Sequence, residues 1–552
     1  MAQQWAKAQH KQERREQGRI LAPYEDFKEV FSEEAAKWFP PEREDDHAIK
    51  LLPDAPKTFS CKIYSISAQE TTFLQEWVKE NLDKQFIRES KSPYASPTFL
   101  IKKKNEDFRV IQDYRKLNEW TVPDISPLPL ISSIIKNLHG RMLFMKLDIR
   151  WGYHNIQIKE GDQEKATFKT TIGQYEPMVM NFRLQNAPAT FQWMMNKVLR
   201  PVRAQYGEDV QGYMDDILIT TKRDIQYHRE VVRAVLSALK EASLFLKPEK
   251  CKFEKGKVEY LGLLLNGDTI EPDPSKVSGL KTWPTMLKNV REVRETVGIL
   301  NFNHTFIEKF AHIAKPLTEL LKKDIPFKWM DWQTQALEQL IEKVTMQPIL
   351  VHPDPEKPFE PEVDASDYAT RAILFQRNNK GKARPIGYHS KTFSDTKQWY
   401  DIYNKELTAI DRGLENWWHL LLSSPVTVHT DHSNLTYYWH PHKLTDHTHC
   451  AVSRIMWYNL HIKHKPGIHN RANALSRRPD YDKRVQPEEE IGLPEHLFIH
   501  DISALDLNDA ICNAQIHNHN TITQLLNHHP LTKTAEGWTV MGHLVVVGNN
   551  KL

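Results

Sequence analysis

The chain has 552 residues, of which 40% are hydrophobic and 26% charged, and its formal net charge is +3. That length corresponds to about three or four domains of ordinary size, and no apolar run approaches the roughly 18 residues that a membrane-spanning helix requires. The first twenty residues are charged throughout and lack the apolar centre of a secretory signal. We therefore expect a multidomain soluble protein that is neither exported nor inserted in a membrane.

The cysteines are scattered, with no close pair: Cys61, Cys251, Cys450 and Cys512. This spacing argues against a disulfide framework and against a zinc site, and it favours a reducing compartment.

Composition divides the chain into five parts. Residues 1–60 are charged and end in a proline-rich junction, which predicts a helical leader and a linker. Residues 61–265 mix helical stretches such as "AQETTFLQEWVKENLDK" with strand-like runs such as "RMLFMKLDI", "QYEPMVMNF" and "VEYLGLLL". Residues 266–355 are mostly helical, residues 356–478 form a second α/β unit, and residues 479–552 are a tail rich in His and Asn.

Basic side chains concentrate near the start of the first α/β unit. Residues 91–118 carry seven Lys or Arg against three Asp or Glu. Such a cluster is typical of contact with a polyanion, and it is equally typical of a solvated charged face.

The run "QGYMDDILITT" places Asp215 and Asp216 between apolar, β-favouring residues. The simplest geometry is a β-hairpin with the pair exposed at its tip. Adjacent carboxylates repel each other unless a cation holds them together, so the pair suggests a metal site. The alternative is a solvated turn.

A third carboxylate favours the metal site. In "LFMKLDIRWGYHNIQI", Asp148 ends another apolar strand, and the aromatic residue Tyr153 follows five residues later. Three carboxylates can hold two divalent cations, which can activate a hydroxyl and stabilise a leaving pyrophosphate.

Several motifs now resemble the reverse transcriptase and ribonuclease H section of Ty3/Gypsy-type LTR retrotransposon polyproteins. They occur in that family's order and cover about residues 20–480: "SKSPYASPTFLIKKK", "FRVIQDYRKLN", "PLPLI", "KLDIRWGYHNIQI", "NAPATFQWMMN", "GYMDDILI", "LKPEKCKFEKGKVEYLG" and "ALSRRPD". The resemblance implies an α+β multidomain fold. It would be a right-hand polymerase with fingers, palm and thumb, followed by a connection and an RNase H-like α/β domain.

The resemblance also assigns polymerase residues. Asp148, Asp215 and Asp216 match the catalytic, metal-binding carboxylates, and Tyr153 matches the gate that excludes a ribose 2′-hydroxyl. Further substrate-binding positions match the fingers residues that hold the incoming triphosphate, the "MNFRLQ" segment beside the nucleotide, and a lysine that could protonate the leaving pyrophosphate: Lys102, Arg109, Phe182 and Lys250.

The second α/β unit offers another acidic set. By resemblance, Asp364 on a strand, Glu406 on an amphipathic helix and Asp431 at a strand end are catalytic metal ligands of a ribonuclease H. Singly, each is more often a cap or a surface residue. An integrase core also uses three acids, but in the order Asp, Asp, Glu.

The resemblance implies cofactors and partners as well. We expect two Mg²⁺ per active site, with Mn²⁺ as a possible substitute, an RNA template, a primer–template duplex and deoxynucleoside triphosphates. Self-association is left open, no membrane partner is expected, and the location would be intracellular, in a cytoplasmic virus-like particle or in the nucleus.

The departures from the family pattern are equally informative. "MNFRLQ" stands where the family usually has "MPFGLx", so Arg183 replaces a glycine beside the nucleotide. "KKNEDFR" likewise replaces "KKDGSxR", Arg371 replaces another glycine, and Asn473 replaces the last acidic ligand of the ribonuclease H. Each of the changes from Gly to Arg, Gly to Glu and Asp to Asn can arise from one guanine-to-adenine change. We hypothesise a partly decayed copy, which an excess of that change in the codons would test.

These departures leave alternatives open. The chain could be a catalytically dead protein that still binds primer and template, or a host-adopted scaffold whose tail carries the function. We expect Asn473 to weaken the ribonuclease H in Mg²⁺, because an amide oxygen is a poorer ligand for a hard cation. Asn473 could instead cap a helix, with Asp480 or a water completing the site. In the tail, "GWTVMGHLVVVGNNKL" resembles the strand segment that precedes an integrase zinc module, and four clustered histidines lack the two cysteines of a zinc site.

Overall fold

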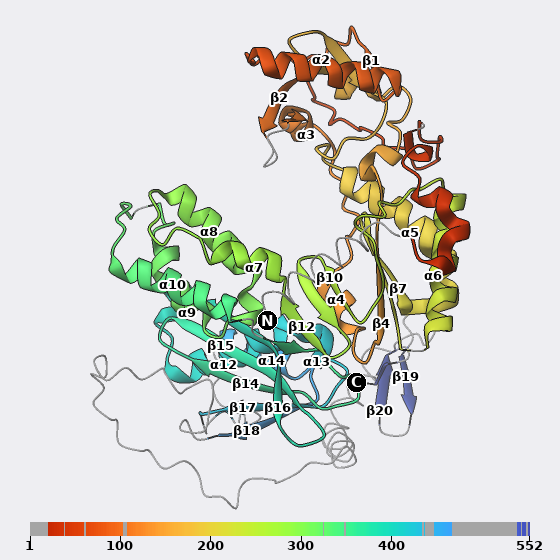
Figure 1. Ribbon diagram of the computed structural model, residues 1–552. Coiled ribbons are helices and arrows are strands. Elements are labelled where there is room, and N and C mark those ends of the chain that lie inside the picture. Colours follow the sequence, from red (N-terminus) through yellow and green to blue (C-terminus); the bar gives the residue numbers. More distant parts are fainter. Residues whose placement is uncertain are drawn as a thin grey trace, which may run out of the picture. The chain divides into compact units, whose positions relative to one another are not determined.

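The computed structural model describes residues 20–37, 39–59, 62–102, 108–222, 224–323, 325–346, 349–432, 435 and 446–465, and three short strands between 538 and 551. The chain separates into two units, residues 1–477 and 478–552 (Figure 1). Among the helices of these described residues, none is long and apolar enough to cross a membrane.

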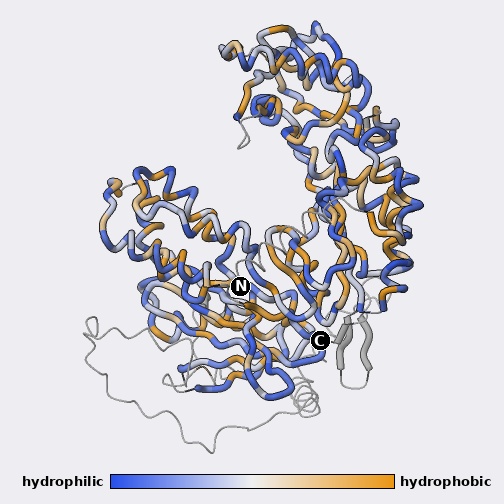
Figure 2. The backbone as a smooth tube through the Cα atoms, viewed as in Figure 1, coloured by the Kyte–Doolittle hydropathy of each residue, from blue (hydrophilic) through white to orange (hydrophobic). Residues whose placement is uncertain are grey.

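A four-stranded sheet in the order β7-β8-β4-β9 is the centre of the first α/β part. Two long helices pack on it, and their apolar residues recur at helical spacing toward the sheet. Figure 2 shows hydrophobic segments gathered where these helices and strands meet. The elements are α4 (Ile131–Lys136), β4 (Leu143–Asp148), η3 (Gly152–Asn155), η4 (Gln163–Ala166), α5 (Ala187–Tyr206), η5 (Gly207–Asp209), β7 (Val210–Tyr213), β8 (Asp216–Thr221), α6 (Ile225–Glu241) and β9 (Lys252–Lys255).

The segment expected to be a leader and linker packs against this core. η1 (Ala22–Phe31) is followed by η2 (Ala35–Lys37), and buried side chains of η1 join the same hydrophobic cluster as α5 and α6. Tyr24 is fully buried and donates a hydrogen bond to Glu254 at 2.8 Å. In addition, the N–H of Leu246 donates to the carbonyl of Val30 at 2.8 Å. Residues 20–31 are therefore part of the core of this α/β part.

A second sheet, in the order β1-β6-β5-β2-β3, contains the basic segment identified in the sequence. A capping box formed by Ser67 and Glu70 starts the helix that packs beside it. The elements are α2 (Ala68–Asp83), β1 (Ile87–Glu89), β2 (Ser96–Lys102), β3 (Phe108–Gln112), α3 (Arg115–Glu119), β5 (Phe168–Lys169) and β6 (Gln174–Pro177).

The middle of the chain forms a small sheet and a helical cluster. The expected strand "VEYLGLLL" is two strands joined by a turn, in which Leu261 and Gly262 have positive φ. In the mostly helical region, the helix that begins at Val290 ends at Phe302, and a new helix starts at Phe310. The elements are β10 (Lys257–Tyr260), β11 (Leu263–Asn266), β12 (Thr269–Pro272), α7 (Pro274–Leu280), α8 (Val290–Phe302), η6 (His304–Phe306), α9 (Phe310–Glu319), α10 (Asp331–Thr345) and β13 (Leu350–Val351).

The second α/β part has a five-stranded sheet in the order β16-β15-β14-β17-β18. Its first three strands are antiparallel, whereas β17 runs parallel to β14 and to β18. The elements are β14 (Glu360–Ala365), β15 (Ala369–Arg377), β16 (Ala383–Thr392), α11 (Asp395–Gln398), α12 (Ile402–Asn416), α13 (Trp418–Leu421), β17 (Val426–Thr430), α14 (Asp446–Ile455) and β18 (Leu460–His464). In the separate C-terminal unit, β19 (Trp538–Met541), β20 (Leu544–Val547) and β21 (Asn550–Lys551) form an antiparallel sheet.

Candidate active sites

The predicted hairpin at Asp215 and Asp216 is present, and it joins β7 to β8. Tyr213 pairs with Asp216, so Met214 and Asp215 form the two-residue turn, with Met214 at φ +52°. On the other side of β8, Asp148 at the end of β4 pairs directly with Asp216. The N–H of Ile149 also donates to the carbonyl of Asp215 at 2.9 Å. The fold therefore brings all three predicted polymerase carboxylates to one end of the central sheet.

The expectation that the acidic pair lies exposed at a tip was wrong. Both aspartates are half-buried, because neighbouring elements cover the turn. From α5, the buried Gln192 accepts a hydrogen bond from the N–H of Met214 at 2.8 Å. From β10, the hydroxyl of Tyr260 donates to the carbonyl of Asp216 at 3.3 Å. These contacts fix the turn that carries the carboxylates.

Three lysines form ion pairs with two of the aspartates, Asp148 and Asp216. The Nζ atom of Lys146 lies 2.9 Å from Asp216 Oδ1, while Lys247 and Lys250 lie 3.4 and 3.3 Å from the two oxygens of Asp148. Burial raises the pKa of Asp216, Lys146 opposes this shift, and the charges of Asp215 and Asp148 add to it. The three carboxylates supply oxygen ligands of the kind that divalent cations take, but in the described residues their ligand oxygens do not all lie within 4.8 Å of one another, and the lysines compete with a cation for two of them.

Tyr153 lies beside the hairpin on η3, which follows a left-handed residue, Trp151, at φ +66°. Its ring packs against Phe191 with the centroids 5.4 Å apart, and its hydroxyl donates to the sulfur of Met214 at 3.3 Å. Burial raises the pKa of Tyr153, and the charge of Asp215 contributes to the rise. The structure thus places the predicted gate next to the predicted metal ligands.

The other predicted substrate residues lie in two regions. One is the β2–β3 hairpin with the adjacent Phe182, and the other is the group of carboxylates in the first sheet. Lys102 and Arg109 are exposed residues of the β2–β3 hairpin, on either side of the undescribed residues 103–107. The guanidinium of Arg109 lies 4.8 Å from the ring centroid of Phe182. Lys250 contacts Asp148, as described above. Arg109 and Phe182 are therefore together, and Lys250 belongs with the carboxylates.

Arg183 is accommodated in the local backbone. Its guanidinium lies 5.5 Å from the ring centroid of Phe182, so two arginines flank one aromatic ring. Its carbonyl accepts a hydrogen bond from Asn118 at 2.9 Å. Among the described residues with positive φ, Arg183 is absent. The glycine usual in the family is therefore not required here by backbone conformation.

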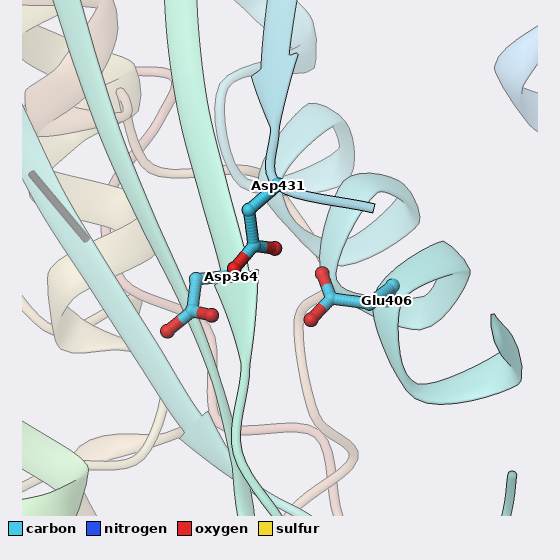
Figure 3. Close-up of side chains that lie close together, drawn as sticks. All are labelled: Asp364, Glu406 and Asp431. Atoms are coloured by element: carbon cyan, nitrogen blue, oxygen red, sulfur yellow. The ribbon is translucent and has the colours of Figure 1, made fainter. Parts of the chain in front are cut away.

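The second acidic set also converges. Asp364 lies on β14, Glu406 on α12, and Asp431 directly after β17. Ligand oxygens of the three lie within 4.8 Å of one another, the one such group of three among the residues that the structure describes. Figure 3 shows Glu406 projecting from its helix toward the two aspartates at the strand ends. The parallel neighbours β14 and β17 explain this meeting, because they end at the same edge of the sheet.

Glu406 is positioned by its helix. Asp401 caps α12 by accepting a hydrogen bond from the N–H of Asn404 at 3.0 Å, and the helix buries Leu407 and Ile410. Glu406 Oε1 accepts from the N–H of Ala365 at 3.0 Å, whereas Oε2 is buried and has no hydrogen-bond partner among the residues that the structure describes. Burial and the charges of the two aspartates raise the pKa of Glu406. An unsatisfied buried carboxylate oxygen aimed at two other acids fits a cation ligand.

Asp364 has a different environment. It pairs across the sheet with Arg371 of β15, whose Nη2 lies 2.6 Å from Asp364 Oδ2. Burial raises the pKa of Asp364 to about 6, although Arg371 opposes the rise. The residues therefore fit one cation near Glu406 and Asp431, while a protein cation already occupies one oxygen of Asp364.

Two protein families match this chain at these sites. The family described as "Reverse transcriptase (RNA-dependent DNA polymerase)" matches residues 101–265, and "RNase H-like domain found in reverse transcriptase" matches residues 329–428. The chain carries a reverse transcriptase domain followed by an RNase H-like domain. The first match contains Asp148, Asp215 and Asp216, and the second contains Asp364 and Glu406.

Relatives from Schizosaccharomyces pombe extend the match. The transposon Tf2-3 and Tf2-7 polyproteins are each 31% identical to this chain over 515 residues, which is 91% of this chain and 37% of theirs. The chain thus spans just over a third of the length of these relatives. The resemblance of the reverse transcriptase and RNase H-like domains to a Ty3/Gypsy-type polyprotein is confirmed.

Solved structures confirm the fold class. A foamy viral protease-reverse transcriptase in complex with double-stranded DNA aligns with a TM-score of 0.67 at 19% identity, covering 82% of this chain and 81% of that one. The same protein in complex with an RNA/DNA hybrid gives 0.66 at 19% identity, covering 86% and 66%. We therefore call the central sheet and its helices the palm, and the sheet with β2 and β3 the fingers.

Some site residues were missed by sequence reasoning. Lys146 precedes Asp148 by two residues on one strand, so both lie on one face, a signal that period-2 alternation could have provided. Lys247 lies within the motif that supplied Lys250. Gln192 lies within the quoted motif "NAPATFQWMMN", but no role was assigned to it, since a glutamine in a helix is ordinary. Asn473 lies outside the described residues.

Proposed function

We propose that this chain is an RNA-directed DNA polymerase with a ribonuclease H domain. The observation that carries the proposal is the cross-strand pairing of Asp148 with Asp216 beside the turn at Asp215. This arrangement supports binding of two Mg²⁺ by the three carboxylates. Bound ions would activate the primer hydroxyl and neutralise the departing pyrophosphate.

The chain's own residues would position the substrates. Tyr153 stands beside the carboxylates, where its ring would contact the sugar of an incoming nucleotide and leave no room for a 2′-hydroxyl. Arg109 and Lys102 would hold the triphosphate as charge-assisted donors. A primer–template duplex would bind mainly through its phosphates, which makes the affinity strongly dependent on salt.

The RNase H-like domain would cut the RNA strand of an RNA/DNA hybrid. Asp364, Glu406 and Asp431 would supply the metal ligands, and A-form shape with 2′-hydroxyls would distinguish the hybrid from DNA. The foamy viral complexes with double-stranded DNA and with a hybrid support duplex binding as the shared property of the fold.

The test is extension of a DNA primer on an RNA template with Mg²⁺ and deoxynucleoside triphosphates. Extension that depends on the divalent cation and disappears in Asp148→Asn is the expected result. If primer and template bind but no nucleotide is added, the second candidate function holds, a decayed copy that only binds the duplex. Arg183 and Asn473 favour that second candidate.

A further inference from the structure

The acidic site of the RNase H-like domain contains a positively charged side chain, that of Arg371. Arg371 and Asp364 face each other on β15 and β14, and their side chains are only 8% and 4% exposed. At 2.6 Å, the guanidinium Nη2 is in direct contact with Asp364 Oδ2. A guanidinium keeps its proton in proteins, so this positive charge is permanent.

The contact with Arg371 leaves fewer carboxylate oxygens at this site for a metal ion. A divalent cation beside Asp364 would have to share this carboxylate with Arg371, and the two cations would repel each other in a buried setting with little screening. Among the described residues, the buried oxygens Asp364 Oδ2 and Glu406 Oε2 both lack a hydrogen-bond partner, but only Asp364 Oδ2 is in ion contact with a protein cation, Arg371. The two carboxylates therefore differ in whether a protein charge already compensates them.

We propose that Arg371 fills the ion position beside Asp364, so that the site takes one divalent cation, at Glu406 and Asp431, in place of two. The inference rests on the proposed function only in treating the three acids as a metal site. Arg371 would keep the domain folded without metal by compensating a buried carboxylate, at the expense of two-ion chemistry.

The test counts bound Mn²⁺ in the full chain by electron paramagnetic resonance, without nucleic acid. The parent in this experiment is the double variant with Asp215→Asn and Asp216→Asn. These substitutions remove tight Mn²⁺ binding at the palm. Arg371→Ala in this parent is expected to bind one more Mn²⁺. The first ion should bind about tenfold tighter or more, because a cation at contact distance shifts a carboxylate by about 1–3 pKa units.

Arg377→Ala is the matched control. Arg377 lies on the same strand and pairs with Glu360 of β14 at 2.7 Å, but it is half exposed and contacts none of the three acids. Mn²⁺ binding equal to the parent is expected there. Equal binding in the parent and in Arg371→Ala overturns the inference, as does an equal gain in both arginine variants. Arg371→Gln, which removes the charge but keeps a polar side chain closer in size than Ala, decides the question if Arg371→Ala does not fold.

Hybrid cleavage separates this inference from the proposed nuclease. Arg371→Gly combined with Asn473→Asp is expected to cleave the RNA strand faster in Mg²⁺ than either single variant, with a gain above the product of the two. If the double variant binds the added Mn²⁺ but cleaves nothing, the nuclease function fails and the inference stands. If Asn473→Asp alone gains as much as the pair, Arg371 does not restrict the site.

Discussion

The palm and the RNase H-like domain each contain a group of three carboxylates, but different kinds of basic side chain compensate the negative charge in the two. In the palm, the counter-charges are three lysines whose side chains are 19%, 26% and 57% exposed: Lys146, Lys247 and Lys250. In the RNase H-like domain, Arg371 is buried and contacts Asp364 across the sheet. A lysine on a flexible stem can move aside for an incoming ion, whereas a buried guanidinium cannot leave without exposing its partner. The two sites therefore differ in how easily a divalent cation can enter.

The largest expected effect is at the palm turn. Asp215→Asn should lower primer extension by about 10³-fold or more, because a neutral amide cannot replace a carboxylate in binding two ions. Duplex affinity, measured by anisotropy, should stay within about twofold, since phosphate contacts carry it. Asp224→Asn is the control, because this residue only caps α6. Near parental extension by Asp215→Asn would refute the palm assignment.

The next effect concerns the gate. Tyr153→Ala should reduce discrimination against ribonucleotides by at least about tenfold, because the missing ring opens space beside the sugar. Tyr153→Phe should keep discrimination, since it loses only the hydroxyl contact to Met214. Single-nucleotide incorporation with paired deoxy and ribo substrates measures both. Unchanged discrimination in the alanine variant would place the gate elsewhere.

A third experiment sharpens the contrast through pH. The pKa of Asp364 is raised to about 6, so the folded state binds this proton more tightly than the unfolded state. Stability without divalent cations should therefore fall as pH rises from about 4 to 6, by up to about 3 kcal/mol. Thermal unfolding measured over this pH range in the presence of a chelator tests the predicted loss of stability. Asp364→Asn should reduce the slope but not abolish it, because burial also raises the pKa of Glu406, which contributes in the same direction. A slope in Asp364→Asn equal to that of the parent chain would assign it to other groups.

The smallest effect is expected at Arg183. Arg183→Gly should lower the KM for deoxynucleotides a few-fold with little change in kcat, because Arg183 then no longer shares the ring of Phe182 with Arg109, the residue proposed to hold the triphosphate. Arg183→Lys should behave like the parent chain. Steady-state primer extension at varied nucleotide concentration measures the KM and kcat of each variant. A KM equal to the parent in Arg183→Gly would mean that the local packing has absorbed the arginine.

Much of both sites could be predicted from the sequence because strand ends and hairpins leave local signals. The apolar run around Asp215 and Asp216 predicts the hairpin, and the run before Asp148 predicts the adjoining strand. What could not be predicted depends on residues far apart in the chain. Gln192 covers the turn from another element, which explains why the pair is half-buried. Arg371 was identified as a departure, but only sheet register shows that it contacts Asp364.

The buried η1 segment has a consequence for synthesis. Tyr24 hydrogen-bonds to Glu254, a partner 230 residues later in the chain, and Val30 accepts from the N–H of Leu246. Contacts of such long range form slowly, because a large loop must close first. The earliest of these residues to leave the ribosome must therefore wait, with apolar side chains uncovered, until about residue 254 has emerged. During that interval the growing chain depends on chaperones or on rapid elongation to avoid aggregation.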